Sequence, residues 1–245
     1  MNLAIIGFGS MGMKIKEIAE SRGHIVNVTV DPANPNATHK NIKDAPLENV
    51  DLVIDFSSKD AVMDNINACA SAKKNLVIGT TGWYENLEEV ARIAKENDVG
   101  IFWSANFSIG VNMYYKVIEK AAELMNEYDE YDIWGTELHH NNKADSPSGT
   151  AKEIAKILLE KINRKTEVVY DKLDRKIKPN EIHFSSTRGG AVNFSHTLGF
   201  DSASDTITIT HSARDRGGYA LGAVKVAEWM NEKKGFYSMG DFINS

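Results

Sequence analysis

The sequence predicts an α/β protein with a doubly wound parallel sheet in its N-terminal part and a second, α+β domain with a mixed sheet. Three observations support this fold class. Short apolar runs alternate with helical patterns over residues 1–106. A glycine-rich turn follows the first apolar run. After about Phe107, strand-like runs separated by turn residues replace the alternation, which is typical of an antiparallel or mixed sheet.

The first part contains five apolar runs of the length expected for buried strands. They cover residues 3–9, 25–31, 51–58, 75–83 and 99–108. Helical periodicity occurs between them at residues 14–23, 60–73 and 86–98. Strands and helices that alternate in this way form a parallel sheet with right-handed crossovers and helices on both faces.

The rest of the chain combines helices with a series of strands. We expect helices at residues 111–125, 152–163 and 217–233, and strands at residues 131–140, 181–190, 191–200 and 205–213. No internal repeat or proline-rich linker separates this part from the first. The change of pattern alone therefore places the domain boundary near residue 107.

Composition excludes several classes of protein. A net charge of −6 over 245 residues opposes general nucleic-acid binding, which needs a basic surface. The single cysteine, Cys69, excludes an intramolecular disulfide, and no apolar run reaches the roughly 20 residues of a membrane helix. The N-terminus lacks the basic and apolar regions of a secretory signal. We therefore expect a cytoplasmic protein with no nucleic-acid partner and no membrane segment.

The turn Gly7–Gly12, GFGSMG, has the G-x-G-x-x-G spacing of a dinucleotide-binding loop and lies between a strand and a helix. Gly7 permits the tight turn, Gly9 lets the backbone approach a diphosphate, and Gly12 allows close helix packing. Asp31 ends the second strand, where an acid accepts the ribose 2′-hydroxyl. We therefore expect cofactor contacts from Gly7, Phe8, Gly9, Ser10, Met11, Gly12 and Asp31.

Two observations bear on the choice of cofactor. The Asp31 carboxylate repels a 2′-phosphate and Pro32 cannot pair with one, which favours NADH over NADPH. Lys40 or Lys43 on the next loop leaves NADPH open as an alternative. Polar turns at residues 55–58, 79–83 and 104–108 follow further strands, and we expect them to line the nicotinamide and ribose, because the carboxyl ends of parallel strands form the ligand crevice.

Residues 137–155, ELHHNNKADSPSGTAKEIA, contain the densest group of chemically active side chains. His139 and His140 are adjacent, so on a strand they point to opposite faces and do not easily bind one ion. We therefore expect no metal site. Ser148 lies in P-S-G instead of the G-x-S-x-G of a nucleophilic serine, so capping by Ser146 or Ser148 is the better interpretation.

The same segment combines proton donors with an anion site. The pair Gly149–Thr150 at a helix start exposes backbone amides and adds a hydroxyl, which together suit a carboxylate. His139 can exchange a proton near neutral pH, and Lys143 adds a cation. We therefore expect a small acidic substrate. A dinucleotide sensor with purely structural histidines is the alternative from another class of protein.

These residues resemble the dihydrodipicolinate reductases, properly the 4-hydroxy-tetrahydrodipicolinate reductases, of lysine and diaminopimelate biosynthesis. ELHHNNKADSPSGTA is similar to the family signature E-x-H-H-x-x-K-x-D-x-P-S-G-T-A. GTTGW, SANFSIGVN, and SSTRGG followed by SHT are similar to further family motifs in the same order. The resemblance covers nearly the whole chain.

The resemblance implies reduction of a small cyclic dicarboxylate, 4-hydroxy-tetrahydrodipicolinate, by NADH or NADPH with loss of water. It implies His139 as proton donor or acceptor and Lys143 as a second proton donor. The substrate contacts that it implies are His140, Gly149 and Thr150, and the further cofactor contacts are Gly79, Thr80, Thr81, Ser104, Ala105, Asn106 and Phe107. The implied fold is a Rossmann-type domain of residues 1–106 and 216–245, completed by the C-terminal helix, and a substrate domain of residues 107–215 that builds a homotetramer.

Three positions depart from the pattern of the family. The glycine loop is one residue shorter than the common G-x-x-G-x-M-G form, Asp31–Pro32 replaces a frequent Glu-Arg pair, and Phe194 replaces a glycine two residues before His196. These departures leave open the diphosphate contacts, the cofactor preference and the role of His196. A reductase of another imine or semialdehyde is the nearest rival enzyme, and it would reject a cyclic dicarboxylate.

Overall fold

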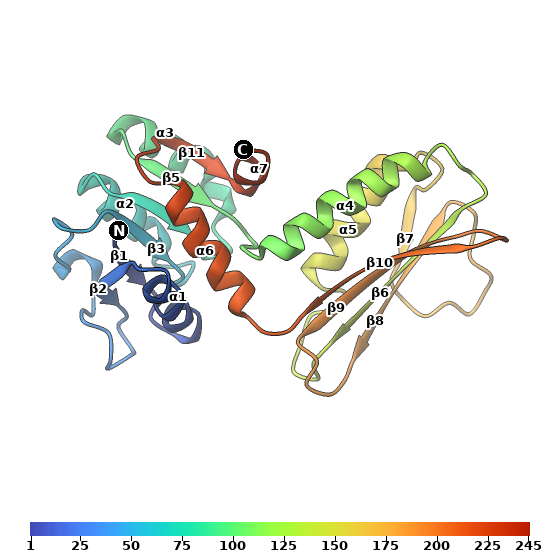
Figure 1. The fold of residues 1–245 in the computed structure, drawn as a ribbon, viewed down its shortest axis with the longest axis horizontal. Helices are drawn as coiled ribbons and strands as arrows, with labels where there is room; N and C mark the ends of the chain where they lie inside the picture. Colours follow the sequence, from blue (N-terminus) through green and yellow to red (C-terminus); the bar gives the residue numbers. More distant parts are fainter. The chain divides into compact units, whose positions relative to one another are not determined.

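The computed structural model describes all 245 residues, and the chain folds into two units. Residues 1–112 and 216–245 form the first unit, and residues 113–215 form the second (Figure 1). The second unit is thus inserted between two segments of the first, and the C-terminal segment returns to the N-terminal sheet.

A six-stranded parallel sheet forms the centre of the first unit, with the strand order β11-β5-β4-β3-β1-β2. Its strands are β1 (Asn2–Ile6), β2 (Ile25–Val30), β3 (Leu52–Asp55), β4 (Asn75–Ile78), β5 (Gly100–Trp103) and β11 (Gly235–Ser238). The strand order reverses at β1, which has β2 on one side and β3 on the other. Sheets of this kind bind ligands beyond the carboxyl ends of the strands at such a point.

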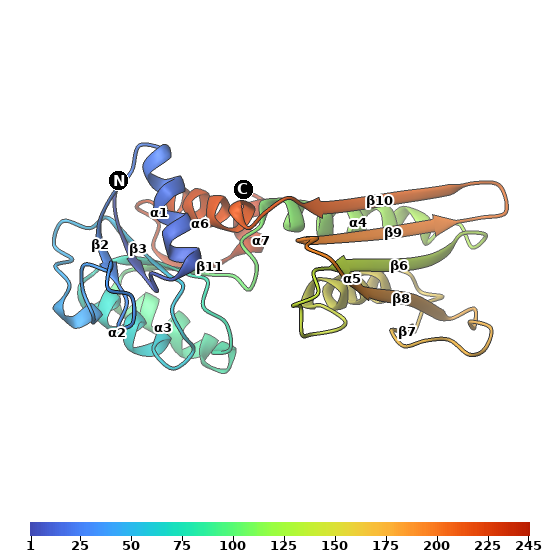
Figure 2. The same cartoon turned by 90° about the horizontal axis from the view of Figure 1, so that it is seen from below.

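Helices cover both faces of this sheet, as Figure 2 shows. On one face lie α1 (Ser10–Ser21) and α6 (Gly217–Trp229), and on the other lie α2 (Val62–Ser71) and α3 (Leu87–Asn97). Successive strand residues enter the two cores in turn, because side chains alternate along a strand. Ile5 and Ile54 pack with α1 and α6, whereas Ala4 and Val53 pack with α2 and α3. The predicted doubly wound parallel sheet is confirmed.

Shorter elements complete the first unit. They are the 3-10 helices η1 (Ile42–Asp44) and η2 (Tyr84–Asn86) and the helix α7 (Met239–Ile243). The C-terminal segment also supplies more than the expected helix, since β11 pairs with β5 at the edge of the sheet. Its four residues are all half-buried, so they lack the apolar pattern of a buried strand. None of the helices in the chain has the length and apolar character needed to cross a bilayer.

The second unit contains a five-stranded mixed sheet with the order β10-β9-β6-β8-β7. Its strands are β6 (Asp132–His139), β7 (Glu167–Val169), β8 (Glu181–Arg188), β9 (Phe194–Asp201) and β10 (Thr206–Ala213). β8 is parallel to β6 and β7, whereas β9 is antiparallel to β6 and β10. The predicted mixed sheet is confirmed, although β7 was not expected.

The helices α4 (Ile109–Met125) and α5 (Gly149–Lys161) lie on one face of this sheet (Figures 1 and 2). Ile133, Phe184 and Leu198 of the sheet form a core with both helices. The opposite face has no helix over it, and we name it the uncovered face. It includes Trp134, Thr136, Leu138, Ser185, Thr197 and Thr210.

Candidate functional site

The glycine loop joins β1 to α1 in the first unit. Gly7 has a φ of +82°, and a Cβ there would stand 2.2 Å from the carbonyl oxygen of Phe56. A Cβ on Gly12 would stand 2.2 Å from the carbonyl oxygen of Gly7, whereas a Cβ on Gly9 would meet no atom within 4 Å. The fold therefore requires glycine at positions 7 and 12, while Gly9, the N-cap of α1, leaves open space before the helix amides.

Asp31 follows β2, and backbone amides fix its carboxylate beside the glycine loop. Oδ2 accepts a hydrogen bond from the N–H of Phe8 (2.9 Å), and Oδ1 accepts from the N–H groups of Ala33 (2.8 Å) and Asn34 (2.9 Å). Burial opposes the charge, but these bonds and the Lys40 ammonium hold the pKa of Asp31 below its ordinary value. The carboxylate is therefore anionic and cannot turn freely.

The turns after β3 and β4 are joined through Asp55, which is fully buried. Its Oδ1 accepts hydrogen bonds from the Thr80 hydroxyl (3.0 Å) and the Ser57 N–H (2.8 Å), and its Oδ2 accepts one from the Asn65 amide (2.9 Å). Burial raises the pKa of Asp55. The hydroxyl of Thr80 is thus engaged within the protein, whereas Thr81 is exposed.

The turn after β5 contains four predicted cofactor residues in different environments. The Ser104 hydroxyl donates to the carbonyl oxygen of Asn106 (2.9 Å) and accepts from its N–H (3.1 Å). Ala105 is exposed, and Asn106 is half-buried. The Phe107 ring lies in the core, 5.6 Å from the Phe56 ring and 5.8 Å from the Phe102 ring. The side chain of Phe107 is therefore a packing residue, and only its backbone is available to a cofactor.

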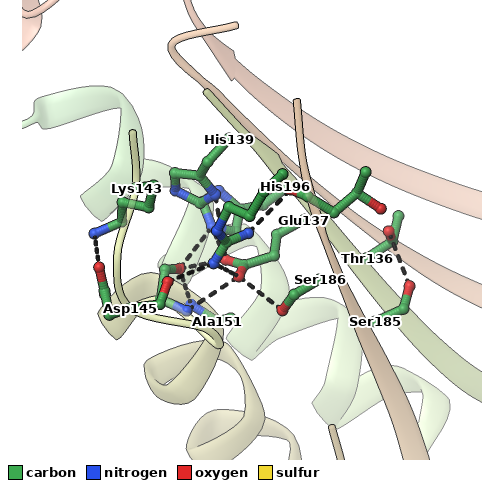
Figure 3. A network of polar contacts seen from close by, with 12 residues as sticks. Thr136, Glu137, His139, Lys143, Asp145, Ala151, Ser185, Ser186 and His196 are labelled. Carbon is green, nitrogen blue, oxygen red and sulfur yellow. Dashed lines mark hydrogen bonds and ion pairs between the residues drawn. The ribbon is translucent and has the colours of Figure 1, made fainter. Parts of the chain in front are cut away.

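The stretch 137–155 forms a polar cluster in the second unit, where β6 ends and α5 begins (Figure 3). His139 is the last residue of β6 and is only 5% exposed, whereas His140 is half-buried. Lys143 lies on the connecting loop and forms an ion pair of 2.5 Å with Asp145. The fold thus brings the predicted proton donors and the predicted carboxylate site into one cluster.

A buried carboxylate, Glu137, lies at the centre of this cluster. Its Oε1 accepts hydrogen bonds from the Ser148 N–H (3.1 Å), the Ser186 hydroxyl (2.8 Å) and the Arg188 guanidinium (2.8 Å). Its Oε2 accepts one from the Ser148 hydroxyl and lies 3.2 Å from Nε2 of His196. Burial opposes the charge, but these donors outweigh it and hold the pKa of Glu137 well below its usual range.

His139 lies against this carboxylate, with its Nδ1 3.6 Å from Oε2 of Glu137. The pKa of His139 is lowered to about 4, mainly by burial. The negative charge of Glu137 raises this pKa, whereas His196, Arg188 and Lys143 lower it further. The imidazole of the free protein is therefore neutral near pH 7.

Phe194, which replaces the glycine of the family pattern two residues before His196, packs on the imidazoles of His139 and His196. The centroid of its ring lies 5.9 Å from that of His139, in a stacked arrangement, and 5.7 Å from that of His196, in an edge-on arrangement. His196 itself is 1% exposed and pairs across the sheet with Glu137, so its place in the cluster is fixed by strand register.

The start of α5 is open to a ligand. Ser148 is the N-cap, and its hydroxyl accepts a hydrogen bond from the Ala151 N–H at 3.2 Å. Gly149 is exposed, and a Cβ there would meet no atom within 4 Å. The amides of Gly149 and Thr150 precede the first intrahelical hydrogen bonds, so they remain donors for an anion. The guanidinium of Arg188 adds positive charge nearby, since it also donates to the carbonyl oxygen of Asp145 (2.6 Å).

Three potential metal ligands occur in the cluster, because Glu137, His139 and His196 offer atoms within 4.8 Å of one another. His196 comes from another strand, so spacing along the chain does not reveal it as a neighbour of His139. The Arg188 guanidinium and two hydroxyls already occupy the same carboxylate. A divalent cation would have to replace these donors beside a fixed positive charge, so the arrangement suits a carboxylate–imidazole–guanidinium network better than a metal centre.

Glu137, Ser186 and Arg188 are candidate site residues to which no role was assigned from the sequence. Glu137 lies two positions before His139 on one strand, so strand periodicity alone places both on the same face. Arg188 reaches the site only through the pairing of β8 with β6, where it lies opposite His139. That pairing could not be read from the sequence.

Comparisons with known proteins identify the family to which the chain is similar. The family model described as dihydrodipicolinate reductase, N-terminus, matches residues 1–107, and the one described as dihydrodipicolinate reductase, C-terminus, matches residues 110–243. The 4-hydroxy-tetrahydrodipicolinate reductase of Christiangramia forsetii is 34% identical over 244 residues, which cover 100% of this chain and 98% of that protein. The protein of the same name from a Wolbachia strain of Drosophila simulans is 36% identical over 267 residues, covering 99% of each chain.

A solved structure shows the same fold. The dipicolinate-bound dihydrodipicolinate reductase of Paenisporosarcina sp. TG-14 superimposes with a TM-score of 0.77 at 21% identity, covering 98% of each chain.

Proposed function

The chain belongs to the dihydrodipicolinate reductase family, and we propose that it reduces 4-hydroxy-tetrahydrodipicolinate to tetrahydrodipicolinate with loss of water. This reaction belongs to the diaminopimelate route to lysine, and we place it in the cytoplasm. The observation that carries the proposal is the position of His139 beside the anionic Glu137, in the same cluster as the open amides of α5.

The residues of the first unit suit a nicotinamide dinucleotide, which supplies a hydride when bound. The open space at Gly9 and the amides of α1 suit its diphosphate, and the Asp31 carboxylate suits a ribose hydroxyl. NADH is the preferred form in this proposal, because Asp31 is held as an anion and would repel a 2′-phosphate. The Lys40 ammonium, the alternative partner of such a phosphate, donates to the carbonyl oxygen of Asn34 at 2.9 Å.

The second unit holds the dicarboxylate in this proposal. One carboxylate accepts hydrogen bonds from the amides of Gly149 and Thr150 and from the Thr150 hydroxyl. Lys143 and Arg188 offset its negative charge, and His140 makes a further contact. Fixing the ring in this way presents one face of it for reduction, which is the positioning part of catalysis.

His139 supplies the proton that must accompany the hydride, and Lys143 is the second donor. Without that proton, the reduced ring would retain an unbalanced negative charge. The bound dicarboxylate brings negative charge to a neutral imidazole, which favours its protonated form. The acid is thus charged when substrate is present, which matches its task.

The test is cofactor oxidation with substrate formed in situ, with NADH and NADPH compared at steady state. We expect the wild-type protein to turn over this substrate. We expect the rate to fall about 100-fold in His139→Gln and in Lys143→Ala, which is typical of the loss of a general acid. Near-native turnover in both variants would remove these residues from the mechanism. A dinucleotide sensor would bind NADH but oxidise none, and pyridine-2,6-dicarboxylate would leave its NADH binding unchanged.

We also propose that the protein forms a homotetramer through the uncovered face of the second unit. The face carries Trp134, which is 37% exposed, and hydroxyl side chains that bond across strands, such as Thr136 with Ser185 (3.1 Å) and Thr197 with Thr210 (3.0 Å). A sheet face without a helix over it suits packing against a second sheet.

A further inference from the structure

We propose that Glu137 is a positioning residue for catalysis, because the negative charge of its carboxylate, 3.6 Å from Nδ1 of His139, favours the proton on Nδ1 and thereby makes Nε2 the nitrogen that gives a proton to the substrate. This inference rests on the proposed reduction. It assigns a role to a carboxylate that does not itself contact the substrate.

The surroundings of Nδ1 support this assignment. Nδ1 of His139 is buried and has no hydrogen-bond partner, and the Oε2 atom of Glu137 lies 3.6 Å away. A proton on Nδ1 faces the anion, whereas the other tautomer would direct a lone pair at it. The Nδ1–H tautomer is therefore the favoured neutral form, and Nε2 is left to exchange the proton.

The carboxylate is itself held in place. Its Oε1 accepts three hydrogen bonds, from Ser148, Ser186 and Arg188, so the group cannot rotate away from the imidazole. Glu137 is 1% exposed and remains an anion, so it neither drifts nor takes up the proton. A fixed anion beside an imidazole stabilises the imidazolium, which is the form that donates.

Other charged groups around His139 oppose that form. Lys143 from the loop, Arg188 from β8 and His196 from β9 all disfavour the imidazolium, as does burial. Glu137 on β6 favours it. Glu137 therefore stabilises the charged form of His139 and acts as the counter-ion of the proton donor within the cluster.

The proton balance of the step is simple. The N–H bond at Nε2 of the imidazolium breaks, its electron pair stays on nitrogen, and the proton goes to the substrate as the hydride arrives. His139 is left as the neutral Nδ1–H imidazole facing Glu137, which has gained no proton. A proton from solvent restores the imidazolium before the next turnover.

The same carboxylate also connects the proton donor to the proposed carboxylate site at the start of α5. Glu137 accepts from both the N–H and the hydroxyl of Ser148, which caps α5. The His139 imidazole and the amides of Gly149 and Thr150 are thus joined through one side chain. This link gives Glu137 an effect on turnover that its charge alone would not have.

The first experiment uses the wild-type chain and the nitrogen-15 NMR shifts of its histidine rings, with His139 assigned by its absence in His139→Gln. We expect the neutral Nδ1–H tautomer in the free protein, and protonation of His139 at higher pH once pyridine-2,6-dicarboxylate is bound. A neutral Nε2–H tautomer would overturn the proposal. This measurement needs no turnover, so it remains decisive even if the proposed substrate is not reduced.

The second experiment compares Glu137→Gln with Glu228→Gln, which removes a carboxylate that also pairs with an arginine and a histidine but lies in the first unit. We expect the kcat of Glu137→Gln to fall about 100-fold, and that of Glu228→Gln to stay within about twofold. In wild type, kcat should fall at high pH as His139 loses its proton. In Glu137→Gln this fall should occur at lower pH, because the imidazolium has lost its counter-ion and its pKa is lower.

A purely structural role predicts a different result. In that case kcat would fall in Glu137→Gln without movement of the pH limb, and Glu137→Asp, which keeps the charge, would lose as much kcat as Glu137→Gln. Either that result or a kcat within about threefold of wild type would overturn the proposal. If Glu137→Gln does not fold, the tautomer of the wild-type imidazole decides.

Discussion

The Glu137 carboxylate accepts hydrogen bonds from both the backbone N–H and the hydroxyl of Ser148, a residue 11 positions further along the chain. The pair ties the end of β6 to the N-cap of α5. The loop between them carries Lys143, so the two proposed proton donors, His139 and Lys143, and the proposed carboxylate site at the start of α5 share one fixed frame. Damage to this pair should therefore affect both stability and ligand binding.

The variant Ser148→Ala tests this frame. It removes the cap bond to Ala151, the hydroxyl bond to Oε2 of Glu137 and the hydroxyl contact with Nε2 of His196, so we expect a loss of about 1–2 kcal/mol in the free energy of unfolding. Binding of pyridine-2,6-dicarboxylate should weaken as well, because the start of α5 is no longer held to Glu137 by the Ser148 hydroxyl. Urea unfolding and calorimetric titration measure the two effects. Ser146→Ala, at an exposed neighbour, is the control, and equal behaviour of the two variants would refute the link.

Two glycines of the loop serve different purposes, one in folding and the other in cofactor binding. Gly12→Ala would place a Cβ 2.2 Å from the carbonyl oxygen of Gly7, so we expect a loss of about 2–4 kcal/mol in stability. Gly9→Ala meets no atom within 4 Å, so its stability should stay within about 1 kcal/mol of wild type. Its affinity for NADH should nevertheless fall about tenfold or more, because the methyl group occupies the space left for the diphosphate. Unfolding curves and NADH titrations of both variants check this.

An unchanged NADH affinity in Gly9→Ala would mean that the diphosphate lies elsewhere. That outcome is meaningful here because the loop is one residue shorter than the common family form.

Local patterns predicted most of the fold, and particular contacts explain what they left out. The parallel sheet follows from buried runs such as residues 52–55, whereas β11 has only half-buried residues and gains its place by pairing with β5. In the site, His139 and Lys143 were found through one continuous stretch. Arg188 and His196 come from β8 and β9, and strand register, which depends on the whole sheet, brings them to Glu137.

The variant Asp31→Asn tests the choice of cofactor. Removing the charge should lower the preference for NADH over NADPH, because the repulsion of a 2′-phosphate disappears. The kcat/KM for NADH should also fall, since the amide can accept fewer of the three backbone N–H groups that now bond to Asp31. Steady-state kinetics with both cofactors measure the ratio. Lys40→Ala is the companion variant, and a selective loss of NADPH use there would show that the lysine serves the phosphate instead.

The variant Trp134→Lys tests assembly through the uncovered face. A lysine at this 37% exposed position would place a charge within the proposed interface, so we expect dissociation into smaller species. Light scattering after size exclusion measures the mass of the particle. Tyr128→Lys, at another exposed aromatic residue, is the control and should keep the wild-type mass. Equal masses for all three proteins would exclude this face as the interface.

Acid sensitivity of the first unit should depend on Glu228. The Arg22 guanidinium donates two hydrogen bonds of 2.8 Å to its carboxylate, and His24 lies 2.8 Å from it, so α6 is tied to the end of α1. The hydrogen bonds from Arg22 lower the pKa of Glu228 from 4.5 to about 2. His24 lowers this pKa as well, whereas burial raises it. A depressed carboxyl pKa gives stability that is complete above pH 4.5 and is lost as the pH falls towards 2.

Glu228→Gln should therefore lose about 1–2 kcal/mol at pH 7, less than the full shift implies because the pair is partly exposed. The difference in the free energy of unfolding between wild type and Glu228→Gln should shrink steadily between pH 4.5 and pH 2. Wild type loses the stabilising charge of Glu228 in this range, whereas the variant lacks that charge at every pH. Urea unfolding at several pH values measures both curves. Glu17→Gln breaks an exposed helix pair and should change stability by less than about 0.5 kcal/mol. A constant difference between wild type and Glu228→Gln across the acid range would show that packing, not charge, holds α6 to α1.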